Sequence, residues 1–151
     1  MKRALTMLLA TGLLLACNSQ NEKENSTTAE PATENHEHTE KANGLVLNNG
    51  AKWKADSTTL ANAAGLQGIV SNAKKESLEN YLQTASRLES GLSKMVNECK
   101  MNGADHDALH QWLEPLMQKT KELKKATASE NAAAVLSDIE KQISLFAQYF
   151  E

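Results

Sequence analysis

Residues 75–100 read KESLENYLQTASRLESGLSKMVNECK, and they carry the strongest structural signal in the chain. Their apolar side chains recur three or four positions apart, at Leu78, Tyr81, Leu82, Ala85, Leu88, Leu92, Met95, Val96 and Cys99. That spacing places them along one face of an α-helix and leaves the other faces to polar side chains. The stretch therefore predicts a long amphipathic helix that packs against other helices.

The same helical period recurs on both sides of this stretch. Three further helices are expected, over residues 57–71, 105–125 and 127–151. Asp56 or Ser57 would cap the first of them, and Thr127 with Glu130 has the spacing of a capping box for the last. Because the loops are only a few residues long, neighbouring helices should be antiparallel. We expect an all-α fold, a four-helix up-down-up-down bundle.

A short β-hairpin is expected before the first helix. Leu45-Val46-Leu47 and Lys52-Trp53-Lys54 flank Asn49-Gly50, a dipeptide that supplies the two positive φ angles of a type I′ turn. A two-residue loop of this type would pair Val46 with Trp53. Since an isolated hairpin is marginally stable, Trp53 should pack on the helices that follow.

Residues 1–16 have the pattern of a signal peptide. Lys2 and Arg3 precede an apolar stretch that is too short to cross a bilayer as a mature helix. The stretch ends in Leu14-Leu15-Ala16-Cys17, which resembles the lipobox of bacterial lipoproteins. This resemblance implies cleavage before Cys17 and attachment of membrane lipid to its sulfur. By analogy with these lipoproteins, an Asp after the cysteine would suggest the inner membrane. Since Asn18 follows here, the resemblance favours the outer membrane, with the protein facing the periplasm or the cell surface.

Residues 17–43 should form a flexible acidic tether between the lipidated Cys17 and a helical domain at residues 44–151. The tether holds no large apolar side chain, so it cannot bury enough surface to offset the entropy of ordering. In the whole chain, aromatics make up only 4%, which argues against a β-sandwich or barrel. The net charge of −3 offers no basic surface for nucleic acid.

Four side chains that can bind soft or borderline metals lie close together in the sequence. They follow the spacing C-x-M-x4-H-x3-H, at Cys99, Met101, His106 and His110. The two histidines are four residues apart and share one helix face. We expect that face to point to the core, because it continues through Leu113 and Met117. Gly103 allows a tight turn that folds the two helix ends together, and Asp105 is the expected N-cap.

The donor types favour copper. Thiolate and thioether ligands select Cu(I), and imidazole suits copper or zinc. Zinc is the second candidate, and it would use Cys99, His106 and His110 but have little use for Met101. The set resembles the ligands of blue-copper sites, although cupredoxins are β-sandwiches, so the likeness concerns the chemistry alone.

Further polar residues accompany this cluster. Asp107 and Glu114 lie three positions before and four after His110, so either carboxylate could orient its ring. In the tether, His36 and His38 alternate around a glutamate and form a candidate accessory site that captures a metal ion for the domain. An envelope metal-handling protein is the expected partner.

Two other interpretations use the same residues. Cys99 could be a small buried hydrophobe with solvated histidines around it, which would leave a structural or interaction lipoprotein that presents its helices to an envelope partner. Cys99 and a histidine could also form a nucleophile and base. We find no signal for an oxyanion hole or a second domain, so we expect no enzyme and assign no catalytic residue. Convergence of sulfur and imidazole nitrogens would favour the metal site.

The mature domain resembles small helical lipoproteins of uncharacterised function. The resemblance rests on LNNGAKW at residues 47–53, on Cys99-x-Met101, and on His106-x3-His110-x-Trp112-Leu113. It extends over most of the mature domain. It implies a lipoprotein with a helical domain and a metal site, and it implies no activity. From the donor residues we separately expect a protein that buffers, senses or chaperones copper.

Overall fold

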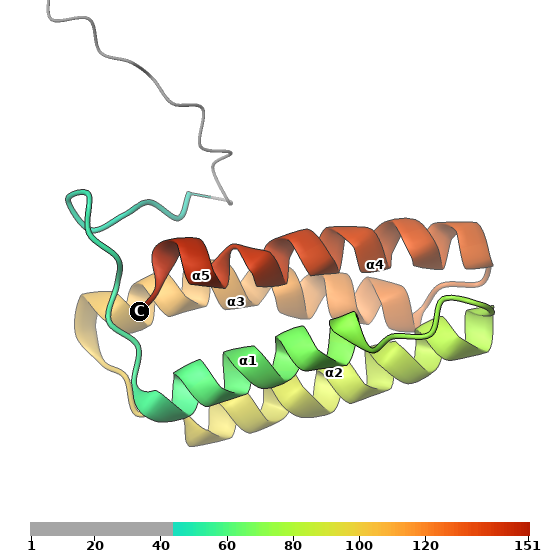
Figure 1. Ribbon diagram of the computed structural model, residues 1–151, viewed down its shortest axis with the longest axis horizontal. Coiled ribbons are helices and arrows are strands. Elements are labelled where there is room, and N and C mark those ends of the chain that lie inside the picture. Colours follow the sequence, from blue (N-terminus) through green and yellow to red (C-terminus); the bar gives the residue numbers. More distant parts are fainter. Residues whose placement is uncertain (1–43) are drawn as a thin grey trace, which may run out of the picture. The chain divides into compact units, whose positions relative to one another are not determined.

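The computed structural model describes residues 44–151; the expected signal peptide, Cys17 and the tether with His36 and His38 lie outside the described residues. The described part contains five helices and no strand: α1 (Ser57–Ser71), α2 (Leu78–Glu98), α3 (Gly103–Lys124), α4 (Ser129–Ser144) and α5 (Phe146–Tyr149) (Figure 1). The predicted all-α class is confirmed. None of these helices is long and apolar enough to cross a membrane.

The four long helices enclose one hydrophobic core. Each packs against the next along the chain, and α1 also packs against α4. In Figure 1 the loops after α1 and α3 lie at one end of the helices, and the loop after α2 lies at the other. Within residues 44–151 the buried apolar side chains extend from Leu45 to Phe150, and a chain that starts at Asn18 contains all of them.

The boundaries of α1 agree with the sequence prediction because a local interaction sets its start. Asp56 is the N-cap, and its Oδ1 accepts a hydrogen bond from the Thr59 backbone N–H at 2.6 Å. In α2 the helix begins at Leu78, three residues later than predicted, because Ser77 caps it and accepts from the Asn80 N–H. A capping side chain thus defines the first turn of both helices.

Two predicted caps are wrong. The N-cap of α3 is Asn102 rather than Asp105, because Gly103 adopts a φ of +62° and the helix starts there. The capping box at Thr127 and Glu130 does not form: the N-cap of α4 is Ala128, without a side-chain hydrogen bond. The last predicted helix is also divided, since α4 ends at Ser144 and α5 follows after Leu145.

The predicted hairpin is reduced to its turn. Asn49 and Gly50 have φ angles of 51° and 87°, and Asn48 and Ala51 exchange backbone hydrogen bonds of 2.8 and 3.0 Å. The pairing stops there. Trp53 donates its backbone N–H to Tyr149 O at 2.8 Å and accepts one from Glu151 at 3.0 Å, while its indole N–H donates to Val46 O. The C-terminal segment therefore takes the place of the first hairpin strand as the backbone partner of Trp53.

A buried pair of hydrogen bonds joins α3 to α4. Trp112 is fully buried, and its Nε1 donates to the Gln142 carbonyl at 2.7 Å. In return, the Gln142 side-chain amide donates to the Trp112 carbonyl at 2.9 Å. Phe146 packs edge-to-face on Trp112 and stacks on Phe150, with ring centroids 4.9 and 4.8 Å apart. This cluster fixes how α3 and α4 are rotated against each other.

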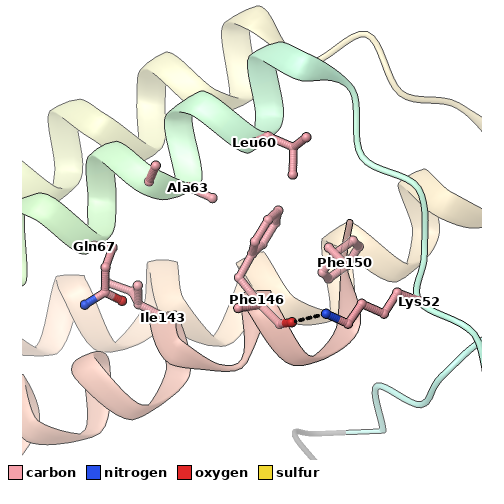
Figure 2. Close-up of a pocket in the computed structure, with 9 residues that line it drawn as sticks. Lys52, Leu60, Ala63, Gln67, Ile143, Phe146 and Phe150 are labelled. Carbon is pink, nitrogen blue, oxygen red and sulfur yellow. Dashed lines mark hydrogen bonds between the residues drawn. The ribbon is translucent and has the colours of Figure 1, made fainter.

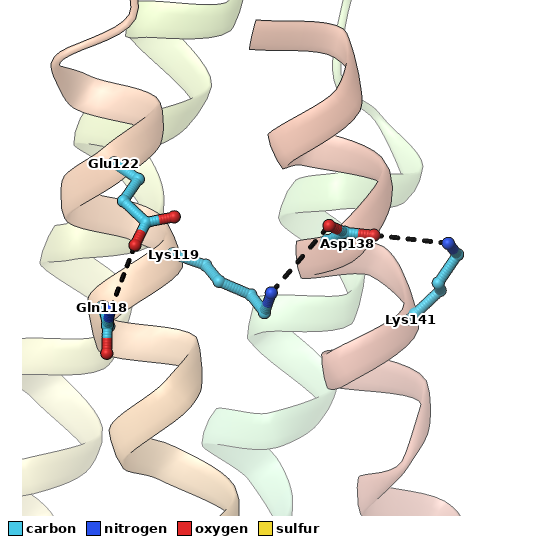
Figure 3. Close-up of polar contacts among 5 residues, drawn as sticks. All are labelled: Gln118, Lys119, Glu122, Asp138 and Lys141. Atoms are coloured by element: carbon cyan, nitrogen blue, oxygen red, sulfur yellow. Dashed lines mark hydrogen bonds and ion pairs between the residues drawn. The ribbon is translucent and has the colours of Figure 1, made fainter. Parts of the chain in front are cut away.

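Weaker polar contacts lie on the exposed surface of α3 and α4. Figure 3 shows Asp138 on α4 between Lys119 of α3, at 3.9 Å, and Lys141 of its own helix, at 3.3 Å. A further hydrogen bond joins Gln118 to Glu122 along α3. Since exposed ion pairs add little free energy, the buried Trp112–Gln142 pair is the stronger constraint between α3 and α4.

Replacing Gln142 should therefore destabilise the fold. We expect Gln142→Ala to lower the free energy of unfolding by about 2 kcal/mol, through the lost hydrogen bond and the lost packing of the buried side chain. Gln148→Ala, at an exposed position of α5, is the matched control and should change stability by less than about 0.5 kcal/mol. Urea unfolding of the chain from Asn18 measures both, and equal effects would contradict the assigned role.

Candidate functional site

The turn between α2 and α3 carries the predicted donor residues. Cys99 is the C-cap of α2, and its backbone N–H donates to Met95 O at 3.0 Å. Asn102 precedes α3, and Gly103 takes the positive φ that the tight turn requires. Because the connection between the two helices is so short, Cys99 at the end of α2 lies beside the first turns of α3.

Three of the four predicted metal ligands approach one another at this turn. Cys99 Sγ lies 3.7 Å from His106 Nδ1, and His106 Nε2 lies 2.9 Å from His110 Nε2. The two imidazole rings meet edge to face, with centroids 4.6 Å apart. Glu114 Oε1 then lies 3.6 Å from His110 Nδ1. The result is a continuous chain of contacts from the thiol through two imidazoles to a carboxylate.

The histidines do not face the core, so that expectation is wrong. His106 is half-buried, and the side chain of His110 is 51% exposed. The buried face of α3 instead begins with Ala108, Leu109 and Trp112. Because the Trp112–Gln142 bonds set the rotation of α3, the two histidines lie at the border between core and solvent. The donors are consequently accessible to an ion from solution.

Met101 and Asp107 lie apart from the contacts that join Cys99, the two histidines and Glu114. Met101 is half-buried and packs against the hydrophobic core. Asp107 is exposed, and none of the hydrogen bonds and ion pairs found within residues 44–151 connects it to His110. Of the two carboxylates expected to orient His110, only Glu114 therefore comes near it.

The arrangement falls short of a complete metal centre. Within residues 44–151, no group of three or more His, Cys, Asp or Glu side chains is placed to hold one ion. The reason lies in His106, which uses Nδ1 toward Cys99 and Nε2 toward His110, on opposite edges of its ring. One ion can reach Cys99 and His106 together, but His110 must rotate to join them.

Two aspartates hold the turn in place, and sequence reasoning did not find this role. Asp56 Oδ2 accepts from the backbone N–H of Lys100 at 2.9 Å, directly beside Cys99. Asp105 Oδ1 accepts from the backbone N–H of Lys54, also at 2.9 Å. Asp56 was expected only as a helix cap. Because its second bond joins residues 44 positions apart, no local pattern could have revealed it.

These hydrogen bonds also set the charge of Asp56. The backbone N–H of Thr59, followed by that of Lys100, lowers the pKa of the Asp56 carboxyl, and partial burial opposes them only in part. Both donors stabilise the ionised form, which is the form that caps α1 and holds the turn. The stability of the turn is therefore linked to the ionisation of this group.

We expect Asp56→Asn to remove a pH-dependent part of the stability. The folded pKa lies below the ordinary value of about 3.9, so the contribution of Asp56 is present above that value. It is lost as the pH falls through the folded pKa. The variant should be about 1 kcal/mol less stable at pH 7, and the difference should shrink below pH of about 3.9.

Urea unfolding at pH 7 and at a pH below about 3.9 measures the difference in stability between the parent and Asp56→Asn. Asp107→Asn, which removes a carboxylate at an exposed position near the same turn, is the control. A constant gap between the parent and Asp56→Asn across the pH range would contradict the role of the charge.

Comparison with family models, with curated proteins and with solved structures found no match in any of the three. The case for a function therefore rests on the chemistry of this turn.

Proposed function

We propose that this chain is a lipid-anchored lipoprotein of the cell envelope that binds a soft or borderline transition metal, with copper as the favoured ion. The observation that supports it is the approach of the Cys99 thiol to two imidazoles at the α2–α3 turn. The protein would buffer, sense or chaperone the ion in exchange with an envelope metal-handling protein. The proposal includes no catalytic residue.

The proposal includes the architecture that presents the site. The four long helices form an up-down-up-down bundle over residues 44–151, in keeping with the alternating ends of their loops in Figure 1 and the packing of α1 on α4. Lipid on Cys17 and the tether at residues 17–43 would hold this domain at the outer membrane. The tether histidines, His36 and His38, would capture ions for the turn.

The distance between Cys99 and His106 suits one ion. Metal bonds of about 2.3 Å to sulfur and about 2.0 Å to an imidazole nitrogen together exceed the 3.7 Å that separates the two atoms. A single ion therefore fits between them in a bent arrangement. His110, which is exposed, rotates to supply the next donor, and Glu114 then orients its ring.

The donor set favours Cu(I) over zinc. Structural zinc is almost always bound by four ligands at once, whereas here a thiol and two imidazoles contact one another in sequence and the Glu114 carboxylate lies on the far side of His110. A thiolate selects soft Cu(I), and the Met101 thioether, two residues from Cys99, is a further soft donor if the turn opens. We therefore assign zinc second place.

The compartment adds a chemical argument for a bound metal. Cys99 is a free, half-buried thiol in the part of the chain that the structure describes. With Cys17 lipidated, Cys99 would be left as a single thiol in an oxidising compartment, open to sulfenic acid or mixed disulfides. Coordination of Cu(I) would protect the sulfur from both reactions.

A titration of the chain from Asn18 with Cu(I), under reducing conditions and against a competing chelator, tests the proposal. We expect one ion per chain and protection of Cys99 from alkylation, with weaker binding at low pH because protons compete for the donors. Cys99→Ala should abolish this tight binding. The double variant His36→Ala, His38→Ala should retain it. Unchanged affinity in Cys99→Ala would refute the site.

A matched pair of variants on α3 tests the imidazole. His106→Ala should lower the Cu(I) affinity at least tenfold, because it removes the donor beside Cys99. Asp107→Ala changes the next residue, which is exposed, and should leave the affinity unchanged. Equal affinities in the two variants would exclude His106 as a ligand.

A second candidate is an interaction lipoprotein without metal. It is favoured by Val46 and Leu47, which are 55% and 39% exposed on the segment before α1. Adjacent exposed apolar side chains are a feature of contact surfaces. Absence of Cu(I) binding in the titration would leave this candidate in place.

A further inference from the structure

A groove separate from the metal-binding turn lies between α1 and the C-terminal helices. Its volume is about 370 Å³, within the range of small-molecule sites. Figure 2 shows Leu60 and Ala63 of α1 on one side and Phe146 on the other. Ala64 and Ala147 also line it, and their small side chains leave the space between the two walls unfilled.

The groove carries a single charge. Lys52 lies at one end, where its ammonium donates to the Ala147 carbonyl at 2.7 Å (Figure 2). An ammonium has three donors, so this bond positions the group and leaves donors for a ligand. Among the described residues that line the groove, Lys52 is the one charged side chain. The nearby Glu151 carboxylate lies outside this lining and is paired with Lys54. A ligand that matches this wall has one anionic end.

The rest of the groove calls for an apolar ligand body. Leu60 is 38% exposed, and an apolar chain laid beside it and Phe146 would remove that surface from water. The wall on α1 extends from Leu60 to Gln67, which is about 10 Å at 1.5 Å per residue. That length suits a short extended acyl chain.

We propose that this groove binds a medium-chain carboxylic acid. The carboxylate pairs with the Lys52 ammonium, and the acyl chain lies between Leu60 and Phe146. The site is independent of the metal-binding turn, so either function can fail without the other.

Calorimetric titration of the chain from Asn18 with decanoate, below its micelle concentration, tests the proposal. We expect saturable binding of one decanoate per chain. Ala64→Phe places a ring in the groove and should lower the affinity at least tenfold. Ala61→Phe is the matched control, since Ala61 is exposed on the same helix but does not line the groove. Absence of saturable binding, or equal affinity in the two variants, would overturn the proposal.

The charge is tested separately. Lys52→Gln should lower the affinity for decanoate at least fivefold and leave the affinity for decanol unchanged, whereas Lys52→Arg and the distant Lys74→Gln should behave as the parent. Unchanged decanoate binding in Lys52→Gln would refute the anionic end. Sedimentation of the parent and Ala64→Phe covers the other occupant: a dimer that the variant dissociates would place a second copy in the groove and overturn the proposal. Cu(I) binding should be unaffected in every variant.

Discussion

The hydrogen bonds between Trp112 and Gln142 are the interaction on which the arrangement of α3 and α4 depends. They are buried and reciprocal, and they fix α3 against α4 where the indole also contacts Phe146. Phe146 stacks on Phe150, whose neighbours pair with the backbone of Trp53. Three residues after Trp53, Asp56 accepts a hydrogen bond from the backbone N–H of Lys100 in the α2–α3 turn. The turn is thus connected, through these contacts, to a core interaction between α3 and the distant Gln142.

This anchoring explains why the turn can be both ordered and open. Two hydrogen bonds tie it to the segment before α1, since Asp56 accepts from the backbone N–H of Lys100 and Asp105 accepts from that of Lys54. Its position therefore does not depend on burying the donors. His110 remains exposed and Cys99 half-buried. Under the proposed function, an ion that enters the turn would have only to reorient an exposed side chain, which would favour exchange over permanent structural binding.

Local pattern was sufficient for much of the fold. The apolar period and the Asp56 cap predicted α1 within its observed bounds, and the tight turn predicted at Gly103 forms with a positive φ. The predictions that failed concern which of several neighbouring residues becomes the N-cap of a helix. Asp105 and Thr127 are good caps by type, yet α3 starts after Asn102, and α4 starts after Ala128. Cys99 and the two histidines come together because the turn is short and the histidines are four residues apart, and the sequence alone gives both of these features.

Helical period and loop length are local properties, and they were enough to establish the all-α class and to predict that thiol and imidazoles meet at one turn. The orientation of those groups needed the packed molecule. Because Trp112 and Gln142 set the rotation of α3, His110 faces solvent and His106 lies between it and Cys99. The partner of Trp53 likewise came from the C-terminal segment, since backbone pairing between distant residues is determined by how the helices pack and leaves no mark in local sequence.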